Sequence, residues 1–554
     1  MTNANSSRTD PVDSTTTPVL WISMLLVGTF ALAAFAAPQR LSSAGEAAFA
    51  FSTSHFGWLY LFATASFIVL LIWLALSRFG EITLGPDDDP PEYGFASWLA
   101  MIFSAGMGVG LVFWGVAEPI MHFVAPPHDL ASPSSPEAAQ LAIQYSVFHW
   151  GLHQWANYSI VALTIAYMRF RRRQPALISS AFRPILGDRV DGWMGWSIDV
   201  AAVLATSFGV ATTLGFGILQ MNGGLHEVMG VPIGPGSQLV IIAVITALFL
   251  VSASTRLNQG ILLLSNLNMW IAMLLAAIVF LAGPTLFILN VGTTAVGDYF
   301  SNVLDMSFQM RPWHDSDWAS SWTVFYWAWG LSWAPFVGMF IARISRGRTI
   351  REFVTGVMLV PAVVSAIWFF IFGGTALHSE LFGTGGISAA VDTDTSLALF
   401  ATLEQLPLGA LLALLSVLLI LTFLITSADS ATFVLGMFTS DGQRNPPRWL
   451  RMLWGVLQAG IAGALLYSGG LDALRTVSIT AALPFLLLLL LMVLSLLKAL
   501  FADQHRRDLE RASRERVLRE LAREANGDAL ARSVVPAQDT PVAEGNDSAE
   551  PSSD

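Results

Sequence analysis

The sequence predicts an all-α membrane protein with twelve transmembrane helices. Hydrophobic residues make up 54% of its 554 positions and charged residues only 12%, whereas soluble globular proteins carry about 25% charged residues. Apolar runs of roughly 20 residues, the length that a helix needs to cross a bilayer, recur twelve times. These runs lie at 18–37, 57–77, 95–123, 140–168, 191–221, 236–254, 260–290, 320–343, 350–377, 407–439, 451–468 and 473–499.

The loops between the runs predict the orientation of the chain, because basic residues in short loops gather on the cytoplasmic side. With the N-terminus inside, the cytoplasmic loops hold Arg78, Arg169, Arg171, Arg172, Arg173, Arg183, Arg189, Arg256, Arg343, Arg346, Arg348, Arg351, Arg444 and Arg448, and the outer loops hold Arg40, Arg311 and Arg475. Residues 1–17 form a polar tail without the features of a cleavable signal peptide. We therefore expect a bacterial cytoplasmic (inner) membrane protein with both termini in the cytoplasm.

Two segments outside the spans have a helical pattern. In the connection at 291–319, the stretch VGDYFSNVLDMSF favours an amphipathic helix on the outer membrane surface, and a loop with scattered hydrophobic residues is the alternative. Residues 501–554 predict a charged cytoplasmic helix followed by a disordered tail. Pairs such as Glu515 and Arg519 support that helix, and Gly527 is expected to end it. Its arginines could contact anionic lipid headgroups, or the helix could simply be solvated.

Two of the spans contain residues that disfavour a regular helix. The third span holds SAGMGVGLVFWG, with Gly106, Gly108 and Gly110 at every second position, and each glycine costs about 1 kcal/mol relative to alanine in a helix interior. The eighth holds FYWAWGLSWAPF, with Gly330 and Pro335. A bilayer helix can be interrupted where the freed backbone lines a cavity, so we expect both spans to be interrupted there. Close helix packing through small residues is the alternative for the glycines.

The two interrupted spans are five apart, which is the separation that an inverted repeat of five plus five helices produces. The first repeat is then residues 95–290, spans three to seven, and the second is residues 320–500, spans eight to twelve. Residues 18–94 supply two additional helices before the repeats. Interrupted helices in both halves indicate the substrate site of a transporter, so the three glycines of the third span are candidate substrate-binding residues.

Aromatic residues gather on the fourth and eighth spans. Trp150, Trp155 and Tyr158 fall within about 100° of one another around a helix of 3.6 residues per turn. The eighth span adds Trp327, Trp329 and Trp333. Two aromatic faces on neighbouring helices can enclose a quaternary ammonium group. Single tryptophans near a membrane surface are more often interfacial anchors, but that explains two clusters less well.

Other chemistry has weaker support in the sequence. His149 and His153 stand one turn apart as in a metal pair, yet no third ligand of suitable spacing follows, and the chain is not expected to be an enzyme. Glu118, Asp199 and Asp429 lie at membrane depth, where ionisable groups are functional candidates. Structural hydrogen bonding is an equally good explanation for these three acids. There are no cysteines, which excludes disulfides and thiolate metal sites.

Three segments carry a resemblance to a known family. SAGMGVGLVFWGVAEP, FHWGLHQW and WAWGLSWAPFVGMFIARISRGRTIREF resemble the glycine stretch and the two tryptophan segments of the betaine/choline/carnitine transporter (BCCT) family. The similarity extends over essentially all twelve spans. It implies a leucine-transporter-like inverted repeat preceded by two extra helices, assembled as a homotrimer.

By position, the resemblance implies an aromatic box around the substrate. Its members would be Trp150, Trp155, Tyr158, Trp327, Trp329, Trp333 and Phe336. One position departs from the pattern, because the family usually has two adjacent tryptophans where this chain has Trp329 followed by Gly330. The missing indole would leave space for a bulkier or differently shaped headgroup.

The resemblance also implies a coupling ion. A sodium site would use carbonyls near Ser104 and Met107 together with groups of Phe423, Thr426 and Ser427. Hydroxyls that bond to their own helix backbone are the alternative. The fifth span lacks the arginine that replaces sodium in the ion-independent members of the family, which favours symport with Na⁺, or else H⁺, and Thr206 is a candidate for a second ion.

Taken together, the sequence predicts a secondary transporter that imports a compatible solute by ion-coupled symport with alternating access. Glycine betaine or choline is the first candidate, and dimethylsulfoniopropionate, carnitine or ectoine are alternatives because of Gly330. A ligand-binding membrane sensor is a further alternative. We expect a small-molecule substrate, no cofactor and no nucleic-acid partner.

Overall fold

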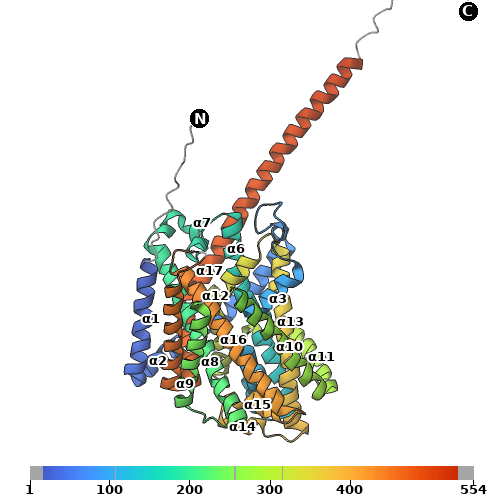
Figure 1. Cartoon of the computed structure of the whole chain (residues 1–554). Helices are drawn as coiled ribbons and strands as arrows, with labels where there is room; N and C mark the ends of the chain where they lie inside the picture. The colour runs from blue at the N-terminus through green and yellow to red at the C-terminus, as the bar shows by residue number, and fades with distance from the viewer. Residues whose placement is uncertain (1–16, 107, 255–257, 315, 444, 534–554) are drawn as a thin grey trace, which may run out of the picture. The chain divides into compact units, whose positions relative to one another are not determined.

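A computed structural model describes residues 17–106, 108–254, 258–314, 316–443 and 445–533. These residues form helices and loops without a β-strand, apart from one isolated bridge between Thr83 and Thr349, so the all-α prediction is confirmed (Figure 1). The chain divides into two compact units between Leu497 and Lys498. The first unit contains every candidate site residue.

The helices follow one another along the chain with mostly short connections. They are α1 (Pro18–Ala36), α2 (Pro38–Leu76), α3 (Phe95–Gly106), α4 (Val109–Val124), α5 (Pro136–Trp150), α6 (Leu152–Ala166), α7 (Arg183–Leu186), α8 (Trp193–Met229), α9 (Pro235–Ser254), α10 (Asn258–Ala282), α11 (Thr285–Phe308), α12 (Phe325–Ile344), α13 (Ile350–Phe382), α14 (Ile387–Thr393), α15 (Ala398–Glu404), α16 (Gly409–Phe438) and α17 (Arg448–Ser533). Short π-helical turns at Tyr167–Arg171 and Ser320–Val324 adjoin α6 and α12.

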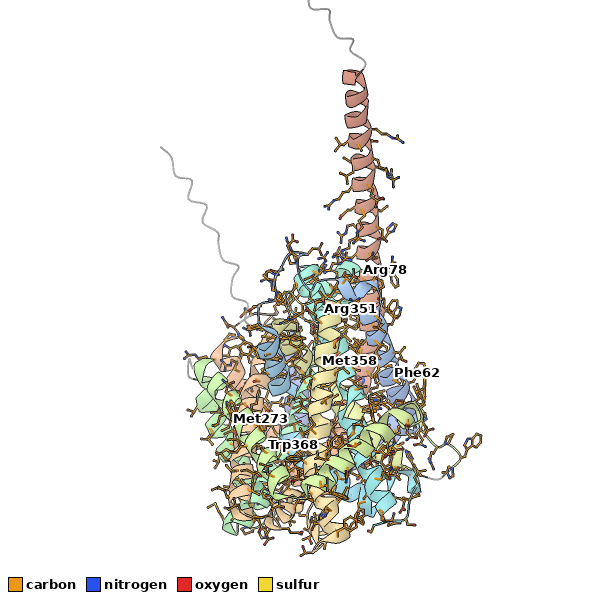
Figure 2. The ribbon with its side chains drawn as sticks, turned by 90° about the vertical axis from the view of Figure 1, so that its right-hand side faces the viewer. Phe62, Arg78, Met273, Arg351, Met358 and Trp368 are labelled. Atoms are coloured by element: carbon orange, nitrogen blue, oxygen red, sulfur yellow. The ribbon has the colours of Figure 1, made fainter. Side chains whose placement is uncertain are left out.

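Within the described part of the chain, nine helices are long and apolar enough to cross a membrane. The chain is therefore a multi-pass membrane protein. The fourth predicted run is divided between α5 and α6, whereas the last two runs lie in α17, where Gly470 has non-helical backbone angles. Figure 2 shows Phe62 and Met273 along the length of the helices and Arg78 and Arg351 together near one end.

Two predicted boundaries are corrected by the structure. Residues 38–56, expected to be a loop, form the first half of α2, because Pro38 suits the first turn of a helix and no further proline follows before Ser77. The seventh run was predicted to continue to residue 290, but α10 ends at Ala282 and α11 begins after Pro284. Proline lacks the N–H that a continuing helix needs.

Both helices predicted outside the spans are present, but the predicted C-terminal end of the charged helix is wrong. In α11, Val296, Phe300 and Leu304 are exposed, which matches the amphipathic pattern. The charged helix is the last part of α17, where Glu515 and Arg519 form an ion pair of 3.6 Å. Gly527 does not end it, since α17 continues to Ser533, because a single glycine weakens a helix without breaking it. The tail predicted at 534–554 lies outside the described residues.

The candidate site is formed where α12 packs against α6 and α8, helices that run through the middle of the bundle in Figure 1. Gly338 permits the close approach of α12 to α6. A Cβ atom at this position would lie 2.6 Å from Cγ1 of Val161 and 3.1 Å from the backbone N of Ala162. Small residues at such contacts allow helix backbones to pack closely in membranes.

We predict that Gly338→Ala destabilises the protein by about 1–3 kcal/mol, the usual cost of overpacking. Gly28→Ala in α1 is the matched control, because a Cβ there meets no atom within 4 Å. The measurement is the apparent melting temperature of the purified protein in detergent. Equal melting temperatures for the two variants would show that the contact between α6 and α12 has room for a side chain.

Candidate substrate-binding site

Two breaks in helices create the site. Gly108 has extended backbone angles (φ −141°, ψ −158°) between α3 and α4, so the predicted interruption of the third span is confirmed, while Met107 lies outside the described residues. A second break, which sequence reasoning missed, occurs at Gly151 between α5 and α6 (φ −89°, ψ −137°). A Cβ at Gly151 would lie 2.5 Å from the carbonyl oxygen of Val147. The glycine directly after Trp150, inside an otherwise apolar and aromatic run, could have indicated this break.

The eighth span is not interrupted as predicted. Helix α12 continues through both Gly330 and Pro335. Helices in a bilayer tolerate proline when neighbouring helices and local adjustments satisfy the freed backbone groups. Among the described residues, the site therefore combines two broken spans, the third and the fourth, with a continuous eighth span.

The helices enclose a cavity of about 30 Å³, which we call the aromatic cavity. It is lined by Gly108, Gly110, Leu111, Trp150, Gln154, Trp155, Tyr158, Thr213, Trp329 and Trp333. Seven of these ten residues were sequence candidates for substrate binding. Leu111, Gln154 and Thr213 were missed because they are neither aromatic residues nor glycines, although Leu111 lies in the glycine segment and Gln154 in the first tryptophan segment.

Hydrogen bonds from α12 to α8 fix two of the indoles. Nε1 of Trp329 donates to Oγ1 of Thr213 at 3.1 Å, and Nε1 of Trp333 donates to the carbonyl of Gly209 at 2.8 Å. The N–H group at the edge of each indole has a hydrogen-bond acceptor in α8, which leaves the ring face available to the cavity. Such orientation is what attraction of a cation to an aromatic face requires.

The rings of the cavity meet in perpendicular pairs. Trp150 and Trp329 have ring centroids 5.6 Å apart at 82°, and Trp155 and Tyr158 are 5.4 Å apart at 85°. Gly110 makes the first pair possible, since a Cβ there would lie 2.3 Å from Cη2 of Trp329. The glycines of the third span thus serve two purposes, the helix break at Gly108 and ring packing at Gly110.

Three candidates whose surroundings are described do not line the aromatic cavity, namely Trp327, Gly330 and Phe336. Trp327 stacks on His153 at 5.1 Å and 10°, because two positions along a helix turn it about 200° away from Trp329. Phe336 packs edge-on behind Trp333 at 5.4 Å. Gly106 is the last residue of α3, and its surroundings lie outside the described part of the structure.

The space beside Gly330 is filled by another side chain. A Cβ at Gly330 would lie 2.3 Å from both Nε2 and Oε1 of Gln154. The structure therefore does not leave the additional room that the sequence suggested at this position. Nε2 of Gln154 donates to the hydroxyl of Tyr158 at 2.8 Å.

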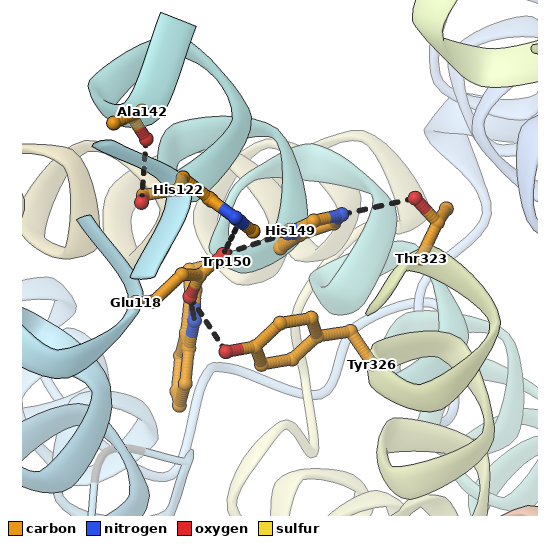
Figure 3. A network of polar contacts seen from close by, with 8 residues as sticks. Glu118, His122, Ala142, His149, Trp150, Thr323 and Tyr326 are labelled. Atoms are coloured by element: carbon orange, nitrogen blue, oxygen red, sulfur yellow. Dashed lines mark hydrogen bonds and ion pairs between the residues drawn. The ribbon is translucent and has the colours of Figure 1, made fainter. Parts of the chain in front are cut away.

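Glu118 is the centre of a buried polar network next to the cavity (Figure 3). Its fully buried carboxylate accepts hydrogen bonds from Nε1 of Trp150 at 2.8 Å and from the hydroxyl of Tyr326 at 2.6 Å. It also contacts Nδ1 of His149 at 2.7 Å, and Nε2 of that ring lies 3.0 Å from Oγ1 of Thr323. Glu118 thus connects α4, α5 and α12 and fixes the indole of Trp150.

Ligand atoms of Glu118, His122 and His149 lie within 4.8 Å of one another, as in a metal site. However, both ring nitrogens of His149 are already engaged. The guanidinium of Arg475 lies 4.5 Å from the ring of Trp322, which is itself 4.4 Å from the ring of His122. A fixed positive charge one ring away opposes a bound cation, so this cluster fits a hydrogen-bond network better than a metal centre.

The other polar candidates at membrane depth, His153, Asp199 and Asp429, have structural partners. His153 does not pair with His149 but contacts Oγ of Ser307 at 2.8 Å. Asp199 accepts hydrogen bonds from the backbone N and Oγ of Ser179, and Asp429 forms a 3.0 Å ion pair with Arg451.

The candidate ion ligands of α16 face the break in the third span. A Cβ at Gly108 would lie 3.7 Å from Oγ of Ser427. Oγ1 of Thr426 donates to the carbonyls of its own helix, at 2.9 Å to Thr422 and 3.1 Å to Phe423, and it accepts from Nδ2 of Asn268 at 3.1 Å.

The remaining ion candidates are less well defined. Ser104 lies in α3, and its side chain is outside the described part of the structure, as is all of Met107. Thr206 is buried in α8, and its hydroxyl has no hydrogen-bond partner among the described residues.

Comparison with known proteins decides the family. Residues 18–505 match the family described as "BCCT, betaine/carnitine/choline family transporter". The chain is a member of the BCCT family. The resemblance noted from its motifs is therefore confirmed, and its BCCT relatives are transporters rather than enzymes.

Several relatives are similar over most of their length. An ectoine/hydroxyectoine transporter of Virgibacillus pantothenticus is 47% identical over 483 residues, which cover 87% of this BCCT chain and 96% of that protein. The glycine betaine transporter OpuD of Bacillus subtilis (strain 168) is 47% identical over 503 residues, 90% of this chain and 96% of OpuD. A probable glycine betaine transporter of Desulfitobacterium hafniense (strain Y51) is 44% identical over 495 residues, 89% and 99% of the two chains.

We predict that Glu118 and Trp150 contribute to stability as one unit. Glu118→Gln and Trp150→Phe should each lower the free energy of unfolding by about 1–3 kcal/mol, because each leaves a buried polar group with a poorer partner or none. The double variant should lose less than the sum, with a coupling of at least about 0.5 kcal/mol.

The measurement is thermal unfolding of the four proteins in the same detergent. Trp454→Phe paired with Trp150→Phe is the control, since Trp454 donates to Oγ1 of Thr439 and shares no hydrogen-bond partner with Trp150. Strict additivity in the cycle of Glu118 and Trp150 would contradict a direct role of the carboxylate in holding the indole.

Proposed function

We propose that this BCCT protein is a secondary transporter that imports a small compatible solute by ion-coupled symport with alternating access. The observation that carries the proposal is the aromatic cavity, a space within the bundle lined by five aromatic side chains and by a helix break. Such a site suits a cationic or zwitterionic headgroup, and its position between broken helices is typical of transporters.

Glycine betaine or choline is the first candidate substrate. The aromatic faces of Trp150, Trp155 and Trp329 fit a methylated ammonium group, and relatives named as glycine betaine transporters are 44% and 47% identical to the chain. Ectoine is the second candidate. Gly330 replaces an expected indole, and a relative named as an ectoine/hydroxyectoine transporter is also 47% identical.

The burial of the cavity supports alternating access. Its lining residues Trp150, Tyr158 and Trp329 are buried within the helical bundle. A solute therefore needs the surrounding helices to move apart before it can enter or leave. This supports a mechanism in which the bundle opens to one side at a time.

Sodium is the proposed coupling ion, with the proton as the alternative. The hard oxygen atoms of Phe423, Thr426 and Ser427 on α16 beside the break near Gly108 support a sodium site, with Ser104 and Met107 on its other side and Thr206 as the candidate for a second ion. The hydroxyl of Thr426 would have to exchange its present bonds for the ion.

We further propose twelve spans in a five-plus-five inverted repeat after two extra helices, with both termini cytoplasmic and three copies in the assembly. The position of Arg78 and Arg351 near one end of the helices (Figure 2) supports the orientation. The arginines in the charged end of α17 support contact with anionic lipid headgroups.

The test is uptake of radiolabelled glycine betaine, choline and ectoine by proteoliposomes containing the full chain. Each solute is offered with an inward sodium gradient, an inward proton gradient or no gradient. We predict accumulation with the sodium gradient that falls at least tenfold in Trp329→Ala, because this variant removes an aromatic face of the cavity.

Trp193→Ala is the matched control, since Trp193 is 68% exposed at the start of α8, and its uptake should match that of the unaltered protein. Binding without accumulation under any gradient would instead favour a sensor. Accumulation driven only by protons would replace sodium as the coupling ion.

A further inference from the structure

The inference concerns the side chain that occupies the space beside Gly330. Gln154 of α6 points its carboxamide at α12, where both Nε2 and Oε1 lie 2.3 Å from the place that a Cβ of residue 330 would take. Only glycine at 330 allows this arrangement. The two residues therefore form one structural unit, which we call the amide notch.

The amide notch belongs to the wall of the aromatic cavity. Gln154 lines the cavity and is only 6% exposed. Its Nε2 donates to the hydroxyl of Tyr158 at 2.8 Å. Oε1 is buried and has no hydrogen-bond partner among the residues that the structure describes. The notch thus holds one satisfied polar atom and one free acceptor in the middle of an aromatic site.

Filling space alone does not explain this side chain. A leucine or methionine would occupy the same volume without a polar atom, and a buried acceptor without a partner is unfavourable. Buried polar groups normally have a partner in the protein, in water or in a ligand. Since Gln154 lines the aromatic cavity, a group on the solute is the natural partner of this acceptor.

We propose that Gln154, in the space provided by Gly330, is a specificity-determining residue that accepts a hydrogen bond from an N–H group of the solute. This rests on the proposed function, because it assigns selectivity to the same cavity. The class of solute that fits is a small zwitterion with an N–H donor on its cationic part, such as the cyclic amidine ectoine. A fully methylated ammonium has no N–H and can use only the aromatic faces.

The two parts of the site are compatible with one such solute. The delocalised cation of an amidine is planar, so it can lie against the face of an indole such as Trp329 while its N–H groups point outward from the ring edge. Tyr158 keeps Gln154 in place through the bond to Nε2. A site that hydrogen-bonds a substrate N–H discriminates against analogues without it, because the acceptor is then left unpaired.

The test measures the affinities of ectoine and glycine betaine for the purified full-length protein by isothermal titration calorimetry. The quantity compared is the ratio of the two dissociation constants. In Gln154→Leu, which keeps the volume but removes the acceptor, preference for ectoine over glycine betaine should fall about tenfold, the value of one hydrogen bond at a buried acceptor. Gln154→Glu keeps an acceptor oxygen and should retain the preference.

Gln458→Leu is the matched control, because Gln458 is an equally buried glutamine of α17 that does not line the cavity. Its ratio should equal that of the unaltered protein. An unchanged ratio in Gln154→Leu, with both solutes still bound, overturns the inference and leaves the proposed function intact. If the unaltered protein binds neither solute, the proposed substrate class itself is wrong.

Discussion

The structure depends on a constraint that lipid imposes on the polypeptide backbone. Inside hydrocarbon every N–H and C=O group must find its partner within the protein, which explains why the described chain is almost entirely helical. The breaks at Gly108 and Gly151 are the departures that matter most. Both occur beside the aromatic cavity, so the departures from helical hydrogen bonding are concentrated at one place in the bundle.

Hydrogen-bond acceptors then orient the aromatic rings that line the cavity. Thr213 and the carbonyl of Gly209 hold two indoles by their N–H groups, and Glu118 holds a third. In each case the N–H edge of the ring meets an acceptor in the protein, and a ring face remains available to the cavity. The aromatic surface of the cavity therefore depends on hydrogen bonds at the ring edges, and Glu118 contributes one of them although it does not line the cavity.

Much of this organisation could be predicted from the sequence. Long apolar runs gave the helical membrane fold, and glycines at every second position gave the break at Gly108, because both are local patterns with a direct physical meaning. The aromatic members of the cavity followed from their motifs. Trp327 lies outside the cavity lining, because residues two positions apart on a helix point in different directions, which a motif alone does not reveal.

Other features could not be predicted because they depend on contacts between distant segments. The partnership of Glu118 with Trp150 and Tyr326 joins three helices, and hydropathy contains no information about it. Gln154 lies within FHWGLHQW, yet its contact with Gly330 becomes visible only when α12 is packed against α6. The continuity of α12 through Pro335 similarly reflects support from neighbouring helices.

The contact between Gln154 and Gly330 also couples two positions that are distant in the sequence during evolution. A larger residue at 330 collides with the carboxamide, so the end of the Gln154 side chain must leave this space before such a residue fits. The effect of a replacement at 330 should therefore depend on which residue occupies position 154, which is epistasis between two helices.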